Sequence, residues 1–215
     1  IIKDFNYQSI KAFSNQEGYS LFVLLFSTFN ILLSKISHAE DIVVGVPVLG
    51  RRHPDLEKII GVFINTLALR TFPKRDKSFK QLIDEVKNNF VQALDNQDYQ
   101  FDNLVEKVVL DRKRRGNPLF DTFFTMMNEM EQEANSLEDS GLVIEGVQNE
   151  SGDSKLDLAL ITVDQGSYIS LNFQYDSKLF RAETIEKFAE YFEEILEALL
   201  KDQNTKIDDV IIMHG

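Results

Sequence analysis

The sequence contains no cysteine in its 215 residues, and basic residues are fewer than acidic ones. Without cysteine the chain has no disulfide, no thiolate nucleophile and no cysteine ligand for a metal. It carries 23 Lys and Arg against 35 Asp and Glu, which gives a net charge of −12. Nucleic-acid binding requires a basic face, so we expect no nucleic-acid partner. The lack of cysteine is typical of a reducing compartment, and we expect a cytoplasmic protein.

Glycine and proline are also infrequent, with 10 and 4 residues, so the chain is not low-complexity material. A chain of this length buries roughly 70% of the surface that its unfolded form exposes, which is enough for one core. We therefore expect a single domain over residues 1–215. The chain begins at Ile1 and shows no signal peptide, so we expect it to be a piece of a longer protein.

Long hydrophobic runs are missing as well. The most apolar stretch, residues 20–36, is interrupted by Ser27, Thr28 and Asn30 and falls short of a full membrane span. We interpret it as a helix that is buried on most of its sides, and we expect no membrane insertion.

The periodicity of the remaining chain predicts helices and strands without strict alternation. We expect further helices over 7–14, from Ser78 onward, over 101–110 and over 182–200; Ser78 and Gln81 have the spacing of a capping box. We expect strands over 41–49, 62–72, 121–130, 142–148, 155–163 and 167–175, the last two forming a hairpin with Gly166 at positive φ. Residues 129–157 are acidic and predict a partly mobile connecting segment. The pattern indicates an α/β fold of the α+β type, with a mixed sheet covered by helices.

A search for catalytic chemistry finds no complete set. The three histidines, His38, His53 and His214, stand in polar turns or beside the C-terminus, and no His pair has zinc-site spacing. No phosphate-binding glycine loop and no nucleophile elbow are present. The residues alone therefore predict no metal site and no catalytic residue.

One apolar segment carries an unexpected polar pair. Residues 61–70 read as a buried strand, yet Asn65 and Thr66 stand in its middle. A buried amide without partners costs on the order of 1–3 kcal/mol. Two interpretations stay open. In the first, Asn65 and Thr66 form hydrogen bonds with neighbouring backbone groups and so fix a bend. In the second, Asn65 faces a cavity, where its amide forms hydrogen bonds with whatever occupies that cavity.

Three segments, in order, resemble core motifs of the condensation domains of nonribosomal peptide synthetases. Residues 59–70, IIGVFINTLALR, resemble the fifth motif; residues 96–106, NQDYQFDNLVE, the sixth; and residues 112–124, RKRRGNPLFDTFF, the seventh. The chain departs from the family pattern at Gln100, which replaces a Pro, at Asp102, which replaces a Glu, and at Arg115-Gly116 before Asn117. Loss of the Pro returns an N–H donor to the loop.

The family's His-His-x-x-x-Asp-Gly motif is absent from these residues. In the family that motif lies on the N-terminal half of a pseudo-dimeric, chloramphenicol-acetyltransferase-like domain. The resemblance therefore implies that this chain is the C-terminal subdomain alone, without the catalytic His and inactive in isolation.

The resemblance also implies a function. The family forms amide bonds between acyl or peptidyl and aminoacyl thioesters, which are carried on the 4′-phosphopantetheine arms of carrier proteins and enter a tunnel between the two halves. The expected partners are the N-terminal condensation subdomain, the carrier proteins and adjacent synthetase domains, with self-association through the exposed face as a further option. Non-catalytic docking of a carrier or partner chain, and a CoA-dependent acyltransferase, stay open as alternatives.

Site residues follow from the matched motifs. The resemblance implies that the tunnel is lined by Asn65, Thr66 and Gln97, with a structural role open for each. Asp98 stands at the C-terminal end of a predicted helix, where its charge is unfavourable with the helix dipole, so we expect it to pair with a cation or to cap the next helix at Phe101. We expect Gly61 to allow close backbone approach. The resemblance implies that Arg112 or Arg115 is the motif's arginine, paired with Asp98 or Asp121. The positions with expected structural roles are Gly61, Phe63, Asp98, Phe101, Arg115, Asn117, Pro118 and Phe120.

Overall fold

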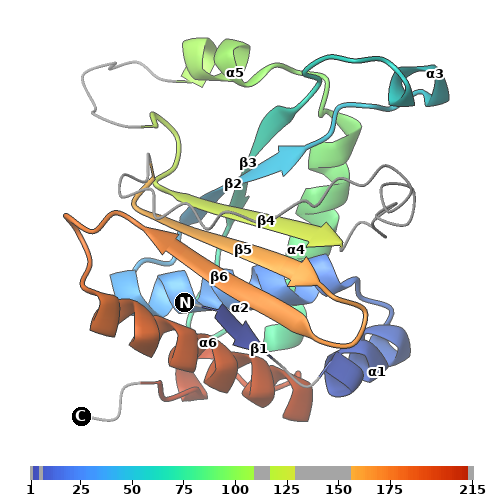
Figure 1. The fold of residues 1–215 in the computed structure, drawn as a ribbon. Coiled ribbons are helices and arrows are strands. Elements are labelled where there is room, and N and C mark those ends of the chain that lie inside the picture. Colours follow the sequence, from blue (N-terminus) through green and yellow to red (C-terminus); the bar gives the residue numbers. More distant parts are fainter. Residues whose placement is uncertain (1, 5–6, 109–116, 129–155, 213–215) are drawn as a thin grey trace, which may run out of the picture.

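Six strands form one mixed sheet in the computed structural model, which describes residues 2–4, 7–108, 117–128 and 156–212 (Figure 1). The spatial order is β1-β6-β5-β4-β2-β3. The strands are β1 Ile2–Asp4, β2 Ile42–Val48, β3 Asn65–Thr71, β4 Thr122–Asn128, β5 Leu158–Asp164 and β6 Ile169–Tyr175. Strand β4 runs parallel to both β2 and β5, and the other neighbours are antiparallel. The predicted mixed sheet is confirmed.

The described helices are α1 Tyr7–Glu17, α2 Leu21–Ser37, α3 Pro54–Glu57, α4 Phe79–Asp95, α5 Phe101–Val108, α6 Ala182–Lys201 and a 3-10 turn at Ile207–Asp209. The central helix α2 contacts both α4 and α6, and these three helices pack against one face of the sheet. Phe124 of β4 meets Phe26 of α2 on this face, and Phe173 of β6 meets Phe192 of α6. The core therefore lies between this helical layer and the sheet.

Helix α2 shows how a mostly apolar helix accommodates polar side chains inside the core. Ser27, Thr28 and Asn30 are fully buried, and each donates a hydrogen bond to the carbonyl four residues earlier. The side-chain oxygen Oδ1 of Asn30 also accepts from the Thr71 hydroxyl at 2.7 Å. These bonds satisfy the polar groups locally, which confirms the prediction of a buried helix.

No single helix among the described residues has the length and hydropathy of a membrane span. Helices α1 and α2 reach that threshold only as a pair, and their axes are bent by 106°.

Several boundaries differ from the sequence prediction. Strand β3 begins at Asn65, so residues 62–64 belong to the connection before it rather than to the strand. The short strand β1 and the 3-10 turn were not predicted, because three residues are too few to show a period. The capping box at Ser78 is confirmed, and Gly166 has a φ of 75° in the β5–β6 hairpin. The predicted strand near 142–148 and most of the acidic segment 129–157 lie outside the described residues.

The segment after α6 returns to the start of α4. Ile207 N–H donates to the Lys77 carbonyl at 2.9 Å and Asp208 N–H to the Arg75 carbonyl at 3.0 Å. In the other direction, Phe79 N–H donates to Thr205 and Lys80 N–H to Gln203. A short backbone ladder therefore joins residues 203–208 to residues 75–80.

Candidate functional site

Asn65 stands at the first position of β3, where it is 7% exposed and fully engaged as a donor. Its amide nitrogen donates to the Gln97 carbonyl at 2.8 Å and to the Tyr99 carbonyl at 2.9 Å. Its amide oxygen accepts from the Phe101 N–H at 3.2 Å. Only an amide both donates twice and accepts in this way without charge. Asn65 thus fixes the turn between α4 and α5, as in the structural alternative; its place in a tunnel stays a prediction.

The seventh motif adds an aromatic contact to the same place. Asn117 Oδ1 accepts from the N–H groups of Leu119 at 3.0 Å and Phe120 at 3.3 Å, which forms a turn through Pro118. The turn directs Phe120 inward, where it is 4% exposed and its ring centroid lies 5.6 Å from that of Phe101. The predicted turn and core anchor are confirmed.

A glycine in β2 makes room for this ring. A Cβ built on Gly45 would lie well within the van der Waals contact distance of the Phe120 ring and 2.8 Å from the ring of Phe123. Sequence reasoning missed Gly45, because a glycine within a run of β-branched residues shows no local sign of what covers it.

The three motifs therefore meet at one end of the sheet. Asn65 of the fifth motif holds the backbone of the sixth, and Phe101 of the sixth packs on Phe120 of the seventh. We call this unit, made of Asn65, Gln97, Tyr99, Phe101 and Phe120, the motif junction. Figure 1 shows α5 above the ends of β2 and β3, where the junction lies.

The other predicted site residues lie around the motif junction. Thr66 faces the opposite side of the sheet from Asn65, since successive strand residues alternate. Gln97 donates from its side chain to the Leu94 carbonyl at 2.9 Å, at the end of α4. Asp98 pairs with a cation, as predicted, but the partner is Arg52 at 2.9 Å. Arg112 and Arg115 lie outside the described residues.

The connection between β2 and β3 is organised by Arg51, which the sequence analysis did not single out. Its guanidinium donates to the carbonyls of Leu56 and Gly61 and lies 4.3 Å above the centre of the Phe63 ring. Close backbone approach occurs at Gly50 and not at the expected Gly61. Gly50 has a φ of 64°, and a Cβ there would overlap the Phe63 carbonyl oxygen, whereas a Cβ on Gly61 would meet only the Phe63 ring, at 3.2 Å.

Aliphatic side chains on this connection face outward. We call them the aliphatic loop: Leu49, Ile59, Ile60, Val62 and Ile64, with exposed fractions from 47% to 101%. Five exposed aliphatic side chains therefore stand on one connection between two strands.

We expect Arg51→Met to loosen the aliphatic loop without unfolding the protein. The change removes two hydrogen bonds and the stacking on Phe63, together worth about 2 kcal/mol of local stability. Amide hydrogen exchange over residues 59–64 should accelerate at least about tenfold. The matched control is Arg52→Met, which breaks the exposed pair with Asp98 and a hydrogen bond to the Asp95 carbonyl, and leaves the contacts of Arg51 in place. Equal exchange in both variants would contradict the role given to Arg51.

The histidines have local structural positions. His53 caps α3, its Nδ1 accepting from the Asp55 N–H at 3.3 Å, and His38 caps the C-terminal end of α2. His214 lies outside the described residues. Among the described residues, no group of three or more His, Asp or Glu side chains is placed to hold a metal ion.

Known proteins match this chain over nearly its whole length. The family model described as "Condensation domain" matches residues 3–214. The chain is 37% identical over 206 residues to bacitracin synthase 3 of Bacillus licheniformis, covering 96% of this chain and 3% of that protein. It is 41% identical over 199 residues to tyrocidine synthase 3 of Brevibacillus parabrevis, covering 92% of this chain and 3% of that protein. The chain thus spans a small part of the curated relatives that it matches.

Solved structures share the fold at lower identity. A four-domain nonribosomal peptide synthetase bound to AMP and glycine superposes with a TM-score of 0.84 at 22% identity, covering 99% of this chain and 17% of that one. The X-domain of teicoplanin biosynthesis, in complex with OxyB, gives 0.84 at 19% identity, covering 100% of this chain and 48% of that one. A condensation domain from the monacolin K polyketide synthase gives 0.80 at 17% identity, covering 96% and 48%.

Proposed function

Because the chain belongs to the condensation-domain family, we propose that it is the C-terminal half of an amide-forming condensation domain in a nonribosomal peptide synthetase. The order of its three motifs and its coverage of 48% of two solved relatives, an X-domain and a condensation domain, support assignment to one half. The complementary half would supply the catalytic histidine, which this sequence lacks.

In the proposed reaction, the amine of a carrier-bound aminoacyl group attacks the thioester carbonyl of the upstream acyl or peptidyl group. A C–N bond forms, the C–S bond breaks, and the upstream pantetheine thiol leaves with a proton. A histidine on the other half would take the amine proton or orient the amine. The role of this chain is to supply one wall of the tunnel that brings the two thioesters together.

The observation that carries the proposal is the aliphatic loop beside the motif junction. The Ile60 side chain is fully exposed and Val62 is 92% exposed, while Arg51 holds their connection in a defined conformation. An ordered aliphatic surface at the motif end of the sheet suits contact with the complementary half.

The test is reconstitution. We expect this chain alone to give no amide product from aminoacyl- and acyl-carrier thioesters, and turnover to appear when an N-terminal condensation subdomain from a close relative is co-expressed with it. The double variant Ile60→Asp/Val62→Asp should abolish copurification of the two halves and turnover together. Its control is Val91→Asp, which places a charge on the exposed face of α4, where the native side chain is 52% exposed.

Two outcomes would overturn the proposal. Turnover by this chain alone would show that it holds its own catalytic group. Normal copurification by the double variant would remove the aliphatic loop from the contact between the halves.

A further inference from the structure

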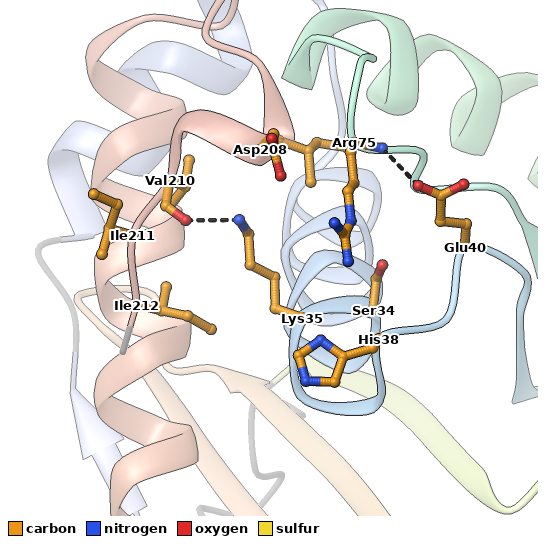
Figure 2. A pocket seen from close by; sticks show the side chains of 10 residues that line it. Ser34, Lys35, His38, Glu40, Arg75, Asp208, Val210, Ile211 and Ile212 are labelled. Atoms are coloured by element: carbon orange, nitrogen blue, oxygen red, sulfur yellow. Dashed lines mark hydrogen bonds between the residues drawn. The ribbon is translucent and has the colours of Figure 1, made fainter. Parts of the chain in front are cut away.

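An open cavity of about 360 Å³ lies far from the motif junction, between the C-terminal end of α2 and the final segment of the chain (Figure 2). The end of α2 and its cap contribute Ser34, Lys35 and His38, and the β3–α4 connection contributes Arg75. Apolar residues of the final segment, among them Val210 and Ile212, close the other side. The cavity thus combines polar groups from two elements with an apolar wall.

Two permanent cations in this cavity have donors to spare. Lys35 Nζ donates one hydrogen bond, to the Val210 carbonyl at 2.6 Å, which leaves two N–H groups. Figure 2 shows the Arg75 guanidinium extending toward Ser34 within the same cavity. Among the described residues, no carboxylate lies within 4.0 Å of that guanidinium. Its planar fork of N–H groups is therefore available to an oxyanion.

An imidazole joins them through unusual backbone geometry. His38 has a φ of 56° and a ψ of 21°, a left-handed conformation that few residues other than Gly adopt. This conformation ends α2 and brings the His38 ring to the cavity wall. The imidazole adds a further N–H donor to the wall.

Within the cavity itself two carboxylates, Glu40 and Asp208, stand against the two cations, Lys35 and Arg75. Glu40 accepts a hydrogen bond from the Arg75 backbone N–H at 3.3 Å, and Asp208 lies opposite on the final segment. A neighbouring cavity of about 620 Å³ shares Lys35 and His38 and adds Arg181 and Lys187 against Glu183. Basic side chains therefore outnumber acidic ones along the two cavities, whereas the chain as a whole carries −12.

We propose that this cavity binds a small dianionic oxyanion, a phosphate ester or a dicarboxylate, through Arg75 and Lys35, with an N–H of the His38 ring as a third contact. The fork of Arg75 donates to two oxygens of either group, Lys35 supplies a point charge, and the apolar wall accommodates a short carbon stem. This site is independent of the proposed function and lies apart from the motif junction.

Partial burial is the main reason why the pKa of the Lys35 ammonium is lowered. The Asp208 charge raises that pKa, the Arg75 charge lowers it, and the Asp209 charge raises it. A bound oxyanion would stabilise the charged ammonium and raise that pKa.

The test is calorimetric titration of the 215-residue chain with inorganic phosphate and, separately, with glutarate, at pH 7 and constant ionic strength. We expect saturable binding of at least one probe, weakened about tenfold in Arg75→Gln, because one charge-assisted hydrogen-bonding group is lost. Asp208→Asn should tighten binding about twofold, since it removes an opposing carboxylate. Arg52→Gln, at the opposite end of the sheet, should leave the affinity unchanged.

The two probes separate the sources of the ligand. Tighter phosphate binding identifies a phosphate ester, and tighter glutarate binding identifies a dicarboxylate. Lys35→Met, with its melting temperature measured alongside, provides a second variant in which binding should fall while the fold is kept. Absence of saturable heat for both probes up to about 20 mM, or equal affinity in the native chain and Arg75→Gln, would overturn the proposal.

Discussion

Replacing Gly45 with Val is expected to lower the free energy of unfolding by about 3 kcal/mol, the upper end of the cost of overpacking a core. The new side chain would occupy the space in which the Phe120 ring rests on β2, and it would also meet Phe123. Phe120 cannot retreat freely, because its ring is buried against Phe101. In a chain of this size the change should lower the melting temperature by about 8 °C.

Two further variants separate the clash with the Phe120 ring from the general cost of replacing a glycine. Gly18→Ala replaces a glycine at a φ of 71° with nothing within 4 Å of its Cβ, so it should cost only about 1 kcal/mol of backbone strain. The pair Gly45→Val/Phe120→Ala should be more stable than the sum of its single changes predicts, since removal of the ring makes room for Val. Strict additivity would show that the ring and the glycine are not coupled.

Asn65→Asp should be at least as damaging. The carboxylate keeps the acceptor for Phe101 N–H, but it replaces a double donor and faces the Gln97 and Tyr99 carbonyl oxygens. We expect a loss of at least about 3 kcal/mol at pH 7, because a buried charge is left facing acceptors.

The loss should depend on pH with a definite sign. Facing carbonyl oxygens and partial burial would raise the folded-state pKa of the new carboxyl above its unfolded value. The penalty is then full above the folded pKa and disappears as the pH falls toward the unfolded pKa, so the variant should gain stability relative to the native chain on acidification. Urea unfolding between pH 7 and pH 4 measures this.

Asn65→Ala distinguishes the two interpretations of this residue. It should destabilise the chain, because three backbone groups lose their partner. In the reconstituted domain, loss of turnover beyond the loss of folded protein would support tunnel lining as well. An unchanged melting temperature in Asn65→Ala would contradict the structural role.

Periodicity predicted most of the fold, because the long elements bury one stripe or one face. The continuous apolar stripe of α6 and the capping box of α4 are local signals, and both are found in the structure. Sequence reasoning also recognised that Asn65 needs partners, but not which ones. Its partners stand 32 to 36 residues away and are backbone groups, which carry no sequence signature.

Gly45 and Arg51 were missed for the same reason: their partners are distant in the sequence or are backbone groups. Gly45 depends on Phe120, which reaches it only through the parallel pairing of β2 with β4. Arg51 donates to backbone carbonyl groups. Every residue type has such a carbonyl, so the sequence does not show where the partners of Arg51 are. Asp98 does pair with a cation. The partner is Arg52, which is distant in the sequence and is brought close only by the fold.

The backbone ladder between residues 203–208 and 75–80 has a mechanical consequence. Tension applied beyond Ile212 would meet the Lys35–Val210 hydrogen bond and then this ladder, with the beginning of α4, before it reached α6. Helix α4 is a rod of 17 residues, about 26 Å long, and its far end leads into the turn that Asn65 clasps. The ladder and α4 thereby form one continuous connection from the final segment to the motif junction at the opposite end of the sheet.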